Sequence, residues 1–270
     1  MPSADFAKLF DLSGQVACLT GGASGMGRST GIVLAQAGAK VILADINEAG
    51  LQETVRFIED TGGEAEAIRV DVTKESEVEG LVQKAVSQHG RIDIMGNIAG
   101  IPQQSLIVDT TEAMMDNLFA INLKGVFFGT KHALKAMIPQ KHGNIVNIAS
   151  GVIHAPGAET WSLYGMSKAA VAMLSKTAAK EAASHGVRVN TVAPGMVITG
   201  FTERHWQDES GKEVPGRKQS FIEGVEQHTP LGMAGHPDHI AHAILYLVSQ
   251  TGEFLTGQII NPNGGAQMPW

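Results

Sequence analysis

A tyrosine and a lysine that could together move a proton lie in the stretch WSLYGMSKAAVAML, residues 161–174. Tyr164 and Lys168 are one helical turn apart, so they share one face of the helix that this stretch predicts. A phenol has an ordinary pKa of ~10, and lowering that pKa by ~3 units requires about 4 kcal/mol of preference for the phenolate. A lysine charge beside the phenol supplies such a preference. The alternative for an isolated pair is a helix-face tyrosine beside a lysine whose stem lies along the surface.

A glycine-rich segment, TGGASGMG at 20–27, predicts a turn that can approach phosphate groups closely. An apolar strand at 15–20 precedes it and a helix at 25–37 follows, and the N-terminus of a helix favours the charge of a pyrophosphate. Asp45 ends the next strand, where a carboxylate would meet the ribose hydroxyls of an adenine nucleotide. A carboxylate there repels a 2′-phosphate, so we expect NAD rather than NADP. Arg28 lies close enough in sequence to offer such a phosphate a counter-charge.

The elements that carry these residues alternate along the chain. Apolar runs predict strands at 15–20, 40–45, 66–71, 92–100, 143–150, 187–195 and 257–265, and helical patterns fall at 25–37, 48–61, 74–89, 111–138, from 161 onward and at 237–249. Strands that are apolar throughout and separated by helices predict an α/β fold with a parallel sheet covered on both faces. No internal repeat or linker interrupts the pattern, so we expect a single domain over 1–270.

Composition narrows the class of protein. The chain has 270 residues, of which 43% are hydrophobic and 17% charged, as in soluble globular proteins with a large core. A net charge of −7 argues against binding to nucleic acid, and no apolar run approaches the ~20 residues of a membrane helix. We see no signal peptide and expect the cytoplasm. Cys18, the single cysteine, is expected in the core rather than in a disulfide or metal site.

Taken in order, the motifs resemble those of the classical short-chain dehydrogenase/reductase family, and the resemblance runs from Gly14 to Gly265. The matching features are TGGASGMG, Asp45, Asp71 with Val72, NIAG at 97–100, Asn122, Ser150, the Tyr164–Lys168 pair and PGMVIT at 194–199. Two positions depart from the usual family pattern. Ala149 stands where the first of two serines is expected, and Ile98 stands where a second asparagine is expected.

The resemblance implies a single-domain, doubly wound Rossmann-type fold and an oxidoreductase that interconverts a secondary alcohol and a ketone by hydride transfer. Tyr164 would be the acid/base, and Lys168 would support it and bind the nicotinamide ribose. Ser150 would hold the substrate oxygen, and Asn122 would hold a water that relays protons to the lysine. The family also implies a homotetramer, with the helix at 111–138 and the helix after Tyr164 at its interfaces and the tail residues Met268 and Trp270 packed on a neighbour.

Two further sets of residues follow from the resemblance. The NAD-binding set comprises Gly21, Ser24, Gly25, Met26, Gly27, Asp45, Ile46, Asp71, Val72, Asn97, Ala99, Gly100, Tyr164, Lys168, Pro194, Gly195, Val197 and Thr199. The residues expected to line the substrate are Ile101, His154, Trp161, Met196 and Trp206.

Residues 200–228 depart from the alternation of strands and helices, because they are polar and show no regular hydrophobic period. Their position directly after Thr199 suits a lid over the substrate, with Phe201, Trp206, Phe221 and Ile222 facing inward. This lining favours an uncharged, fairly apolar substrate such as a cyclic alcohol or ketone over a sugar phosphate. Arg204 and Arg217 could instead meet an acid group.

Other readings of the same residues remain. A nucleotide-sensing regulator or scaffold could keep the fold without turnover. A metal site at His236, His239 and His242 lacks further ligands at matching spacing, and Pro237 with Asp238 suggests a helix start there instead. Ser150 lacks the G-x-S-x-G elbow of hydrolases. Epimerases and dehydratases of the longer family branch carry an extra domain, and enoyl reductases space their tyrosine and lysine further apart.

Overall fold

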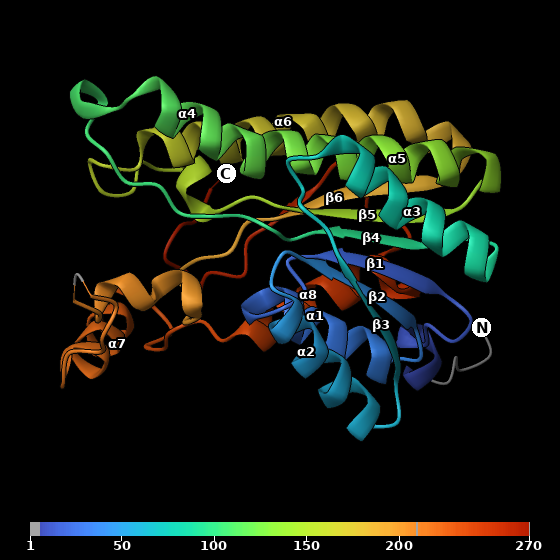
Figure 1. Ribbon diagram of the computed structural model, residues 1–270, viewed down its shortest axis with the longest axis horizontal. Coiled ribbons are helices and arrows are strands. Elements are labelled where there is room, and N and C mark those ends of the chain that lie inside the picture. The colour runs from blue at the N-terminus through green and yellow to red at the C-terminus, as the bar shows by residue number, and fades with distance from the viewer. Residues whose placement is uncertain (1–5, 209, 270) are drawn as a thin grey trace.

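A seven-stranded parallel sheet forms the centre of the computed structural model, which describes residues 6–208 and 210–269 (Figure 1). Its order is β3-β2-β1-β4-β5-β6-β7. The strands are β1 Val16–Thr20, β2 Lys40–Asp45, β3 Glu64–Arg69, β4 Ile94–Asn97, β5 Gly143–Ile148, β6 Val187–Val192 and β7 Ile259–Ile260. The order reverses between β1 and β4, and ligands of such sheets bind at the carboxyl ends of the strands beside this switch point. The predicted parallel sheet is confirmed.

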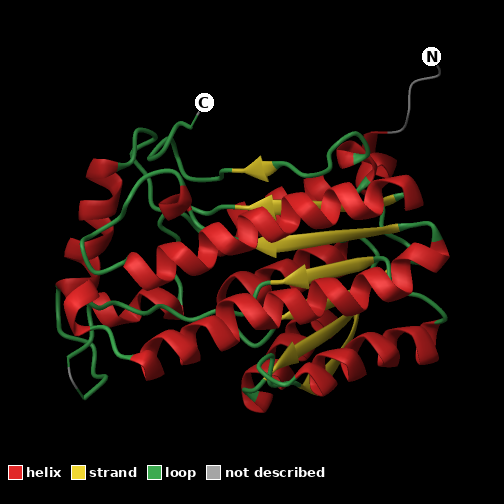
Figure 2. Cartoon of the chain, turned by 90° about the horizontal axis from the view of Figure 1, so that it is seen from above, coloured by secondary structure: helices red, strands yellow, loops and turns green. Residues whose placement is uncertain are grey.

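Helices cover both faces of the sheet (Figures 1 and 2). One layer contains α1 Gly25–Gln36, α2 Glu48–Asp60 and α8 Pro237–Val248, and the other contains α3 Glu75–His89, α5 Gly125–Gln140 and α6 Ser162–Ala182. Within the described residues, no helix has both the length and the apolar character that crossing a membrane demands.

The inner strands are largely buried because helices cover them on both sides, whereas β3 and β7 at the two edges of the sheet are only partly buried. Every residue of β1 and β5 is buried, and successive side chains alternate between two cores. Leu19 packs with the layer of α1, α2 and α8, whereas Cys18 packs with the layer of α3, α5 and α6. Burial raises the pKa of the Cys18 thiol to about 12, so this cysteine is an unreactive core residue, as predicted.

The helix expected at 111–138 is divided in two. It forms α4 Glu112–Phe119, a π-helical turn Ala120–Lys124, and α5, which begins at Gly125. Such turns insert an extra residue into a helix and are frequent at functional sites. The apolar pattern continues across the break, so the break cannot be predicted from the sequence.

The segment at 200–228 has more regular structure than its sequence indicated. It contains a 3₁₀ helix, Gly200–His205, and the helix α7 Arg217–His228. Helix α7 has no buried residue, because its polar sequence supplies no continuous apolar stripe. In Figure 1 this segment forms a separate lobe below α4.

Two of the three histidines at 236–242, His236 and His239, cap the start of α8. The Nδ1 atom of His236 accepts a hydrogen bond from the Asp238 amide at 3.4 Å, and the Nδ1 atom of His239 accepts one from the His236 amide at 3.1 Å. Pro237 is the first residue of α8, so the helix start predicted there is confirmed.

A polar network inside the core changes the role expected for Asn97. Its side chain is 1% exposed, and Nδ2 donates to Oδ1 of Asn147 on β5 at 2.7 Å. Asn147 in turn donates to Oγ of Ser175 on α6 at 2.9 Å. The Asn97 side chain therefore points into the layer of α5 and α6, so only the backbone of Asn97 could line the adenosine side of a nucleotide. It links β4, β5 and α6 instead.

Candidate active site

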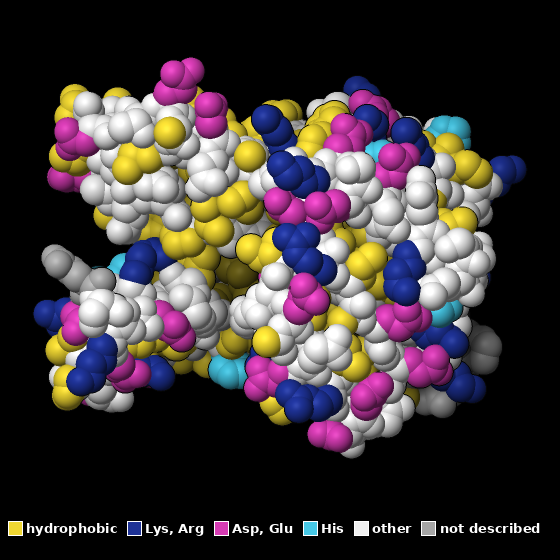
Figure 3. Space-filling view, viewed as in Figure 1, with side chains coloured by type: hydrophobic (Ala, Val, Ile, Leu, Met, Phe, Trp, Pro, Cys, Tyr) yellow, Lys and Arg dark blue, Asp and Glu magenta, His cyan; other side chains and the backbone are white. Residues whose placement is uncertain are grey.

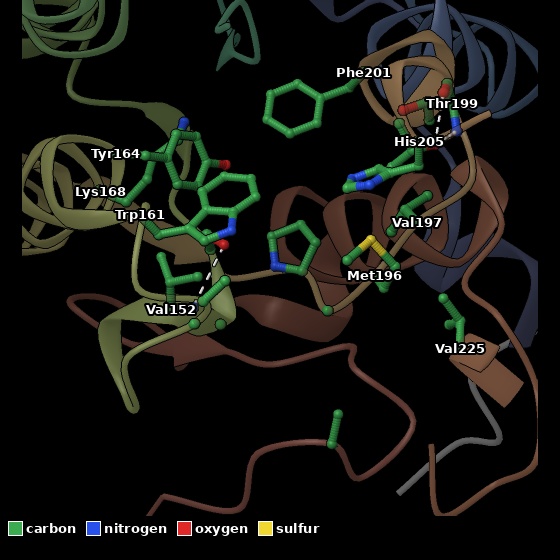
Figure 4. Close-up of a pocket in the computed structure, with 18 of the residues that line it drawn as sticks. Val152, Trp161, Tyr164, Lys168, Met196, Val197, Thr199, Phe201, His205 and Val225 are labelled. Carbon is green, nitrogen blue, oxygen red and sulfur yellow. Dashed lines mark hydrogen bonds between the residues drawn. The ribbon is translucent and has the colours of Figure 1, made fainter. Parts of the chain in front are cut away.

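A cavity of about 720 Å³ opens at the carboxyl edge of the sheet and contains the predicted proton-transfer residues. Figure 3 shows this hollow, lined with hydrophobic side chains, between the lobe that carries α4 and the lobe that carries α7. Ser150 comes two residues after β5, and Tyr164 and Lys168 come from the first turns of α6. All three line the cavity, and Figure 4 shows Tyr164 and Lys168 together at its wall.

Lys168 is buried, with 3% of its surface exposed. Its Nζ atom donates a hydrogen bond to the Ile148 carbonyl oxygen at 2.9 Å and lies 5.6 Å from the centre of the Tyr164 ring. Burial disfavours the charged form and lowers the pKa of Lys168 to about 8. The lysine is thus a partly desolvated cation whose proton is easier to remove than usual.

We expected Lys168 to lower the pKa of Tyr164, but the pKa of Tyr164 is raised. Burial dominates and raises the pKa of Tyr164 to about 12. Two groups act in the opposite direction: the Ser150 side chain, through a hydrogen bond, and the positive charge of Arg204. The sequence predicted Ser150 beside the phenol, but it gave Arg204 no part in setting the pKa of this group.

Asn122 lies in the π-helical turn and uses its side chain to hold the neighbouring loop. Oδ1 accepts a hydrogen bond from the Ile101 amide at 2.9 Å, and Nδ2 donates to the Ile101 carbonyl oxygen at 2.9 Å. A side chain added at Gly100 would lie 3.3 Å from Oδ1 of Asn122 and 3.4 Å from Nζ of Lys168. The turn therefore brings Asn122 and Lys168 to the same glycine, while the predicted proton relay stays a prediction.

The glycine loop fits a group with bulky phosphates. Gly21 has φ of +75°, a conformation that glycine adopts readily, and a Cβ atom at Gly27 would lie 2.0 Å from the Gly21 carbonyl oxygen. Ser24 precedes α1, whose first residue is Gly25. A Cβ atom at Gly25 would lie 3.4 Å from the Thr199 side chain, so the loop reaches the segment after β6. The amides at the start of α1 can hold a pyrophosphate.

Two charged side chains, those of Asp45 and Arg28, contact the glycine loop. The Asp45 carboxylate accepts a hydrogen bond from the Ala23 amide at 3.3 Å and thus lies beside the glycine loop. Arg28 is not available as a counter-charge in this arrangement, because it donates to Glu53 at 2.6 Å and to the Ala23 carbonyl oxygen at 2.7 Å. Ile46, next to Asp45, is 62% exposed and free to contact an adenine.

Of the other residues expected at the nucleotide, Ala99 lies beside this loop, and Asp71 and Val72 lie in the segment after β3. The amide of Ala99 would be 2.8 Å from a Cβ atom at Gly21, so these two segments touch. The Asp71 carboxylate accepts hydrogen bonds from the amide and hydroxyl of Thr73, at 2.9 and 2.7 Å, and these bonds lower the pKa of Asp71. The side chain of Val72 packs against Gly125 at the start of α5. Asp71 and Val72 therefore shape the loop after β3.

The cavity wall contains part of the expected lining. Met26, Gly100, Trp161, Pro194, Gly195, Met196, Val197, Thr199, Phe201 and Phe221 line it. The Tyr164 ring centre lies 4.8 Å from that of Trp161 and 5.8 Å from that of Phe201, and Figure 4 shows His205 and Met196 across the cavity from Trp161 and Tyr164. The two faces of the cavity thus come from α6 and from the segment after β6.

Four expected residues do not line the cavity. Ile101 packs behind Tyr164, where its backbone pairs with Asn122. The Nε2 atom of His154 lies 2.7 Å from Oδ1 of Asn261, beyond β7. Trp206 is 3% exposed and packs against Phe221 from outside the wall, and Ile222 is not part of the lining. The contacts of Ile101, His154 and Trp206 depend on residues distant in the chain, which sequence order alone does not reveal.

The sequence reasoning missed several residues that do line the cavity. They are Gln104, Val152, Gly157, Ala158, Thr202, His205, Ser220, Gly224, Val225, His228, Thr229, Ala266 and Gln267. Residues 220–229 could have been recognised from the short helical pattern SFIEGVEQH, which places one face of α7 toward the preceding segment. Nothing in the sequence around Gln267 points to the cavity.

A parallel sheet with a glycine-rich turn at its switch point is typical of Rossmann-type nucleotide-binding proteins. The chain belongs to the short-chain dehydrogenase/reductase family, because the family model described as enoyl-(acyl carrier protein) reductase matches residues 21–267.

Relatives support this assignment over almost the whole chain. A 3-oxoacyl-(acyl-carrier-protein) reductase of Thermotoga maritima is 38% identical over 256 residues, which cover 94% of this chain and 98% of the relative. The structure of 7α-hydroxysteroid dehydrogenase with NADH and 7-oxo glycochenodeoxycholic acid has a TM-score of 0.87 and 30% identity, with 96% of each chain covered. Gluconate 5-dehydrogenase of Burkholderia cenocepacia with NADP and tartrate has a TM-score of 0.86 and 29% identity, covering 97% and 98% of the two chains.

Proposed function

We propose that this protein is an NAD-dependent oxidoreductase that interconverts a secondary alcohol and a ketone. The observation that carries the proposal is the meeting of Tyr164, Ser150 and Lys168 in one cavity beside the glycine loop. This cluster contains an acid/base, a hydroxyl that can hold the substrate oxygen and a cation. A bound nicotinamide cofactor would supply or accept the hydride.

Tyr164, Ser150 and Lys168 have different roles in the proton transfer. In ketone reduction, the Tyr164 hydroxyl donates its proton to the substrate oxygen, and Ser150 holds that oxygen in place. In alcohol oxidation, the phenolate must form first, so the groups that lower the pKa of Tyr164 matter most in that direction. Lys168 stays next to the phenol and can return a proton to the phenolate. That proton is replaced from solvent at the opening of the cavity.

The choice of NAD over NADP rests on the charges near the glycine loop. Asp45 would repel a 2′-phosphate, and Arg28 is engaged by Glu53 at 2.6 Å. Solved structures of related enzymes hold NADH in one case and NADP in another, so the local charges decide for this chain.

The cavity favours a substrate with an apolar body. Its wall carries Val152, Trp161, Met196, Phe201, Phe221 and Val225. Such a lining suits a cyclic or branched ketone better than a sugar. The 7α-hydroxysteroid dehydrogenase of similar structure was solved with an oxo acid, which agrees with a ketone substrate of this kind.

The alternative is a regulator that binds the nucleotide without turnover. We would incubate the purified protein with NADH or NADPH and a panel of cyclic ketones, and follow oxidation of the reduced nicotinamide. We expect turnover with a higher kcat/KM for NADH than for NADPH. Tyr164→Phe should lower kcat by about 10²-fold or more while NADH affinity stays nearly unchanged. Binding of NADH without turnover on any ketone would favour the regulator, and turnover by Tyr164→Phe at the wild-type rate would refute the role of the phenol.

We also propose that the protein assembles as a homotetramer through the outer faces of α5 and α6. Phe127 on α5 and Met166 and Met173 on α6 are 47%, 53% and 63% exposed, which is unusual for large apolar side chains. Burial between subunits would remove this apolar surface from water. Met268 is 76% exposed, in keeping with a tail that packs on a neighbour, whereas Trp270 lies outside the described residues.

A further inference from the structure

Two polar side chains stand out in the otherwise apolar wall of the cavity. Arg204 and His205 belong to the 3₁₀ helix Gly200–His205 and both line the cavity opposite α6. Within the described part of the chain, Nε of Arg204 and Nε2 of His205 are buried and have no hydrogen-bond partner. A buried polar atom without a partner costs about 1–3 kcal/mol, so two adjacent ones in a binding cavity indicate that a ligand group completes them.

The guanidinium of Arg204 is held in place by aromatic rings. It lies 5.2 Å from the centre of the Trp161 ring and 5.1 Å from the centre of the Phe201 ring. Its Nη1 atom donates to the Phe201 carbonyl oxygen, which is its one hydrogen-bond acceptor among the described residues. A guanidinium has five N–H donors, so most of the donors of Arg204 remain available for a ligand.

His205 is fixed next to this cation. Its ring stacks on Phe221 with the ring centres 4.5 Å apart and the planes 11° apart. Burial and the nearby Arg204 charge lower the pKa of His205, so the imidazole is neutral at neutral pH and can donate one hydrogen bond. The wall therefore presents one cation and one neutral donor, side by side.

The position of Arg204 also limits where the ligand group lies. Trp161 contacts Arg204 on one side and Tyr164 on the other, with ring centres of Trp161 and Tyr164 4.8 Å apart. The ring of Trp161 therefore lies between the Arg204 cation and the proton-transfer residue Tyr164. A substrate group that meets Arg204 must lie within a few bonds of the reacting carbon.

We propose that Arg204 binds a carboxylate or an equivalent anionic group of the substrate, with His205 as a second hydrogen-bond partner. The inference rests on the proposed oxidoreductase function and narrows its substrate to a keto acid or hydroxy acid with an apolar body. This proposal differs from the expectation of an uncharged substrate, because a desolvated cation in an apolar wall pairs best with an anion.

The test compares two substrates that differ in one charge. With saturating NADH, kcat/KM is measured for 3-oxocyclohexane carboxylate and for the corresponding carboxamide, which has the same shape and no charge. The wild-type enzyme should prefer the carboxylate by about 10-fold or more. Arg204→Gln should lower kcat/KM for the carboxylate by about 30-fold or more and for the carboxamide by about 3-fold at most.

Two further variants separate charge from local folding. Arg204→Lys keeps the charge but loses the planar fork, so it should lie between the wild type and Arg204→Gln on the carboxylate. Arg217→Gln removes an exposed charge from the same segment, at the start of α7, and should change neither substrate.

The outcomes separate this inference from the proposed function. Equal losses on both substrates would show that Arg204 acts on Tyr164 rather than on the acid group, and no loss on the carboxylate would equally overturn the inference. Binding of the carboxylate to the complex with oxidised NAD, which cannot reduce the ketone, is measured by calorimetry and gives a second measurement that needs no turnover. If the wild type turned over neither ketone, the proposed function would fail, but affinity for the carboxylate that is lost in Arg204→Gln would still support the anion site.

Discussion

Replacing the buried lysine of the active site should make the protein more stable while it removes activity. In Lys168→Met an apolar side chain of similar length replaces a cation that is 3% exposed. The pKa of Lys168 falls from 10.5 to about 8 in the folded protein, and this difference corresponds to about 3 kcal/mol of destabilisation below pH 8. Loss of the hydrogen bond to the Ile148 carbonyl oxygen offsets about 1 kcal/mol. We expect a net gain of about 2 kcal/mol in the free energy of unfolding at pH 7.

The sign and the pH window follow from proton binding. Between pH 8 and 10.5 the unfolded chain binds the lysine proton and the folded chain does not, so the wild type gains stability as the pH rises. Below pH 8 both states carry the proton and the full destabilisation is present, and above pH 10.5 neither carries it. The advantage of Lys168→Met should therefore be largest at pH 7 and shrink steadily toward pH 10.

The assay is thermal unfolding of both proteins in cofactor-free buffer from pH 6 to pH 10. A gain of 2 kcal/mol corresponds to a rise in Tm of about 5 °C for a chain of this length. Lys176→Met is the matched control, because Lys176 is an exposed lysine of the same helix and its loss should change stability by about 0.5 kcal/mol at most. A lower Tm for Lys168→Met at pH 7, or a gain that is independent of pH, would refute the reasoning.

Two other predictions concern the glycine loop and assembly. Gly27→Ala places a Cβ atom 2.0 Å from the Gly21 carbonyl oxygen, so the loop must move by about 1 Å and NADH affinity or kcat/KM should fall by about 10²-fold. Gly80→Ala in α3, where a Cβ atom meets nothing within 4 Å, should leave both unchanged, and unaltered cofactor binding in Gly27→Ala would contradict the fit of the loop. Light scattering at micromolar concentration should give the mass of four chains, and a monomer would disprove the proposed interface.

The fold could be predicted because burial on both faces leaves a simple pattern. The run VACLT of β1 is buried at every position, and no other common element produces such short, uninterrupted apolar runs between helices. The π-helical turn at Ala120–Lys124 could not be predicted, because it changes the backbone without changing the apolar period. Helix α7 was missed for a different reason: it has no buried residue, and its apolar residues are too few to give a clear helical period.

The residues of the site also fall into two groups: those whose position could be predicted from the sequence and those whose position could not. Tyr164 and Lys168 are near in sequence and on one helix face, so their proximity is a local property that the spacing predicts. The side chain of Asn97 is different, because a single step along a strand decides whether it faces the nucleotide or the core. His154 was placed at the substrate on chain proximity, but its partner Asn261 lies far along the sequence. Long-range pairing of this kind has no signature in one sequence.

The charges of the cavity also bear on the direction of the reaction. Burial keeps Tyr164 protonated at neutral pH, which is the form that donates a proton to a ketone. The positive charge of Arg204 is one of two influences that lower the pKa of this tyrosine. A substrate whose acid group pairs with Arg204 would cancel that charge and keep the phenol protonated while the ketone is bound. The same arginine that would select an anionic substrate would therefore favour its reduction, and alcohol oxidation by this protein should need a higher pH than ketone reduction.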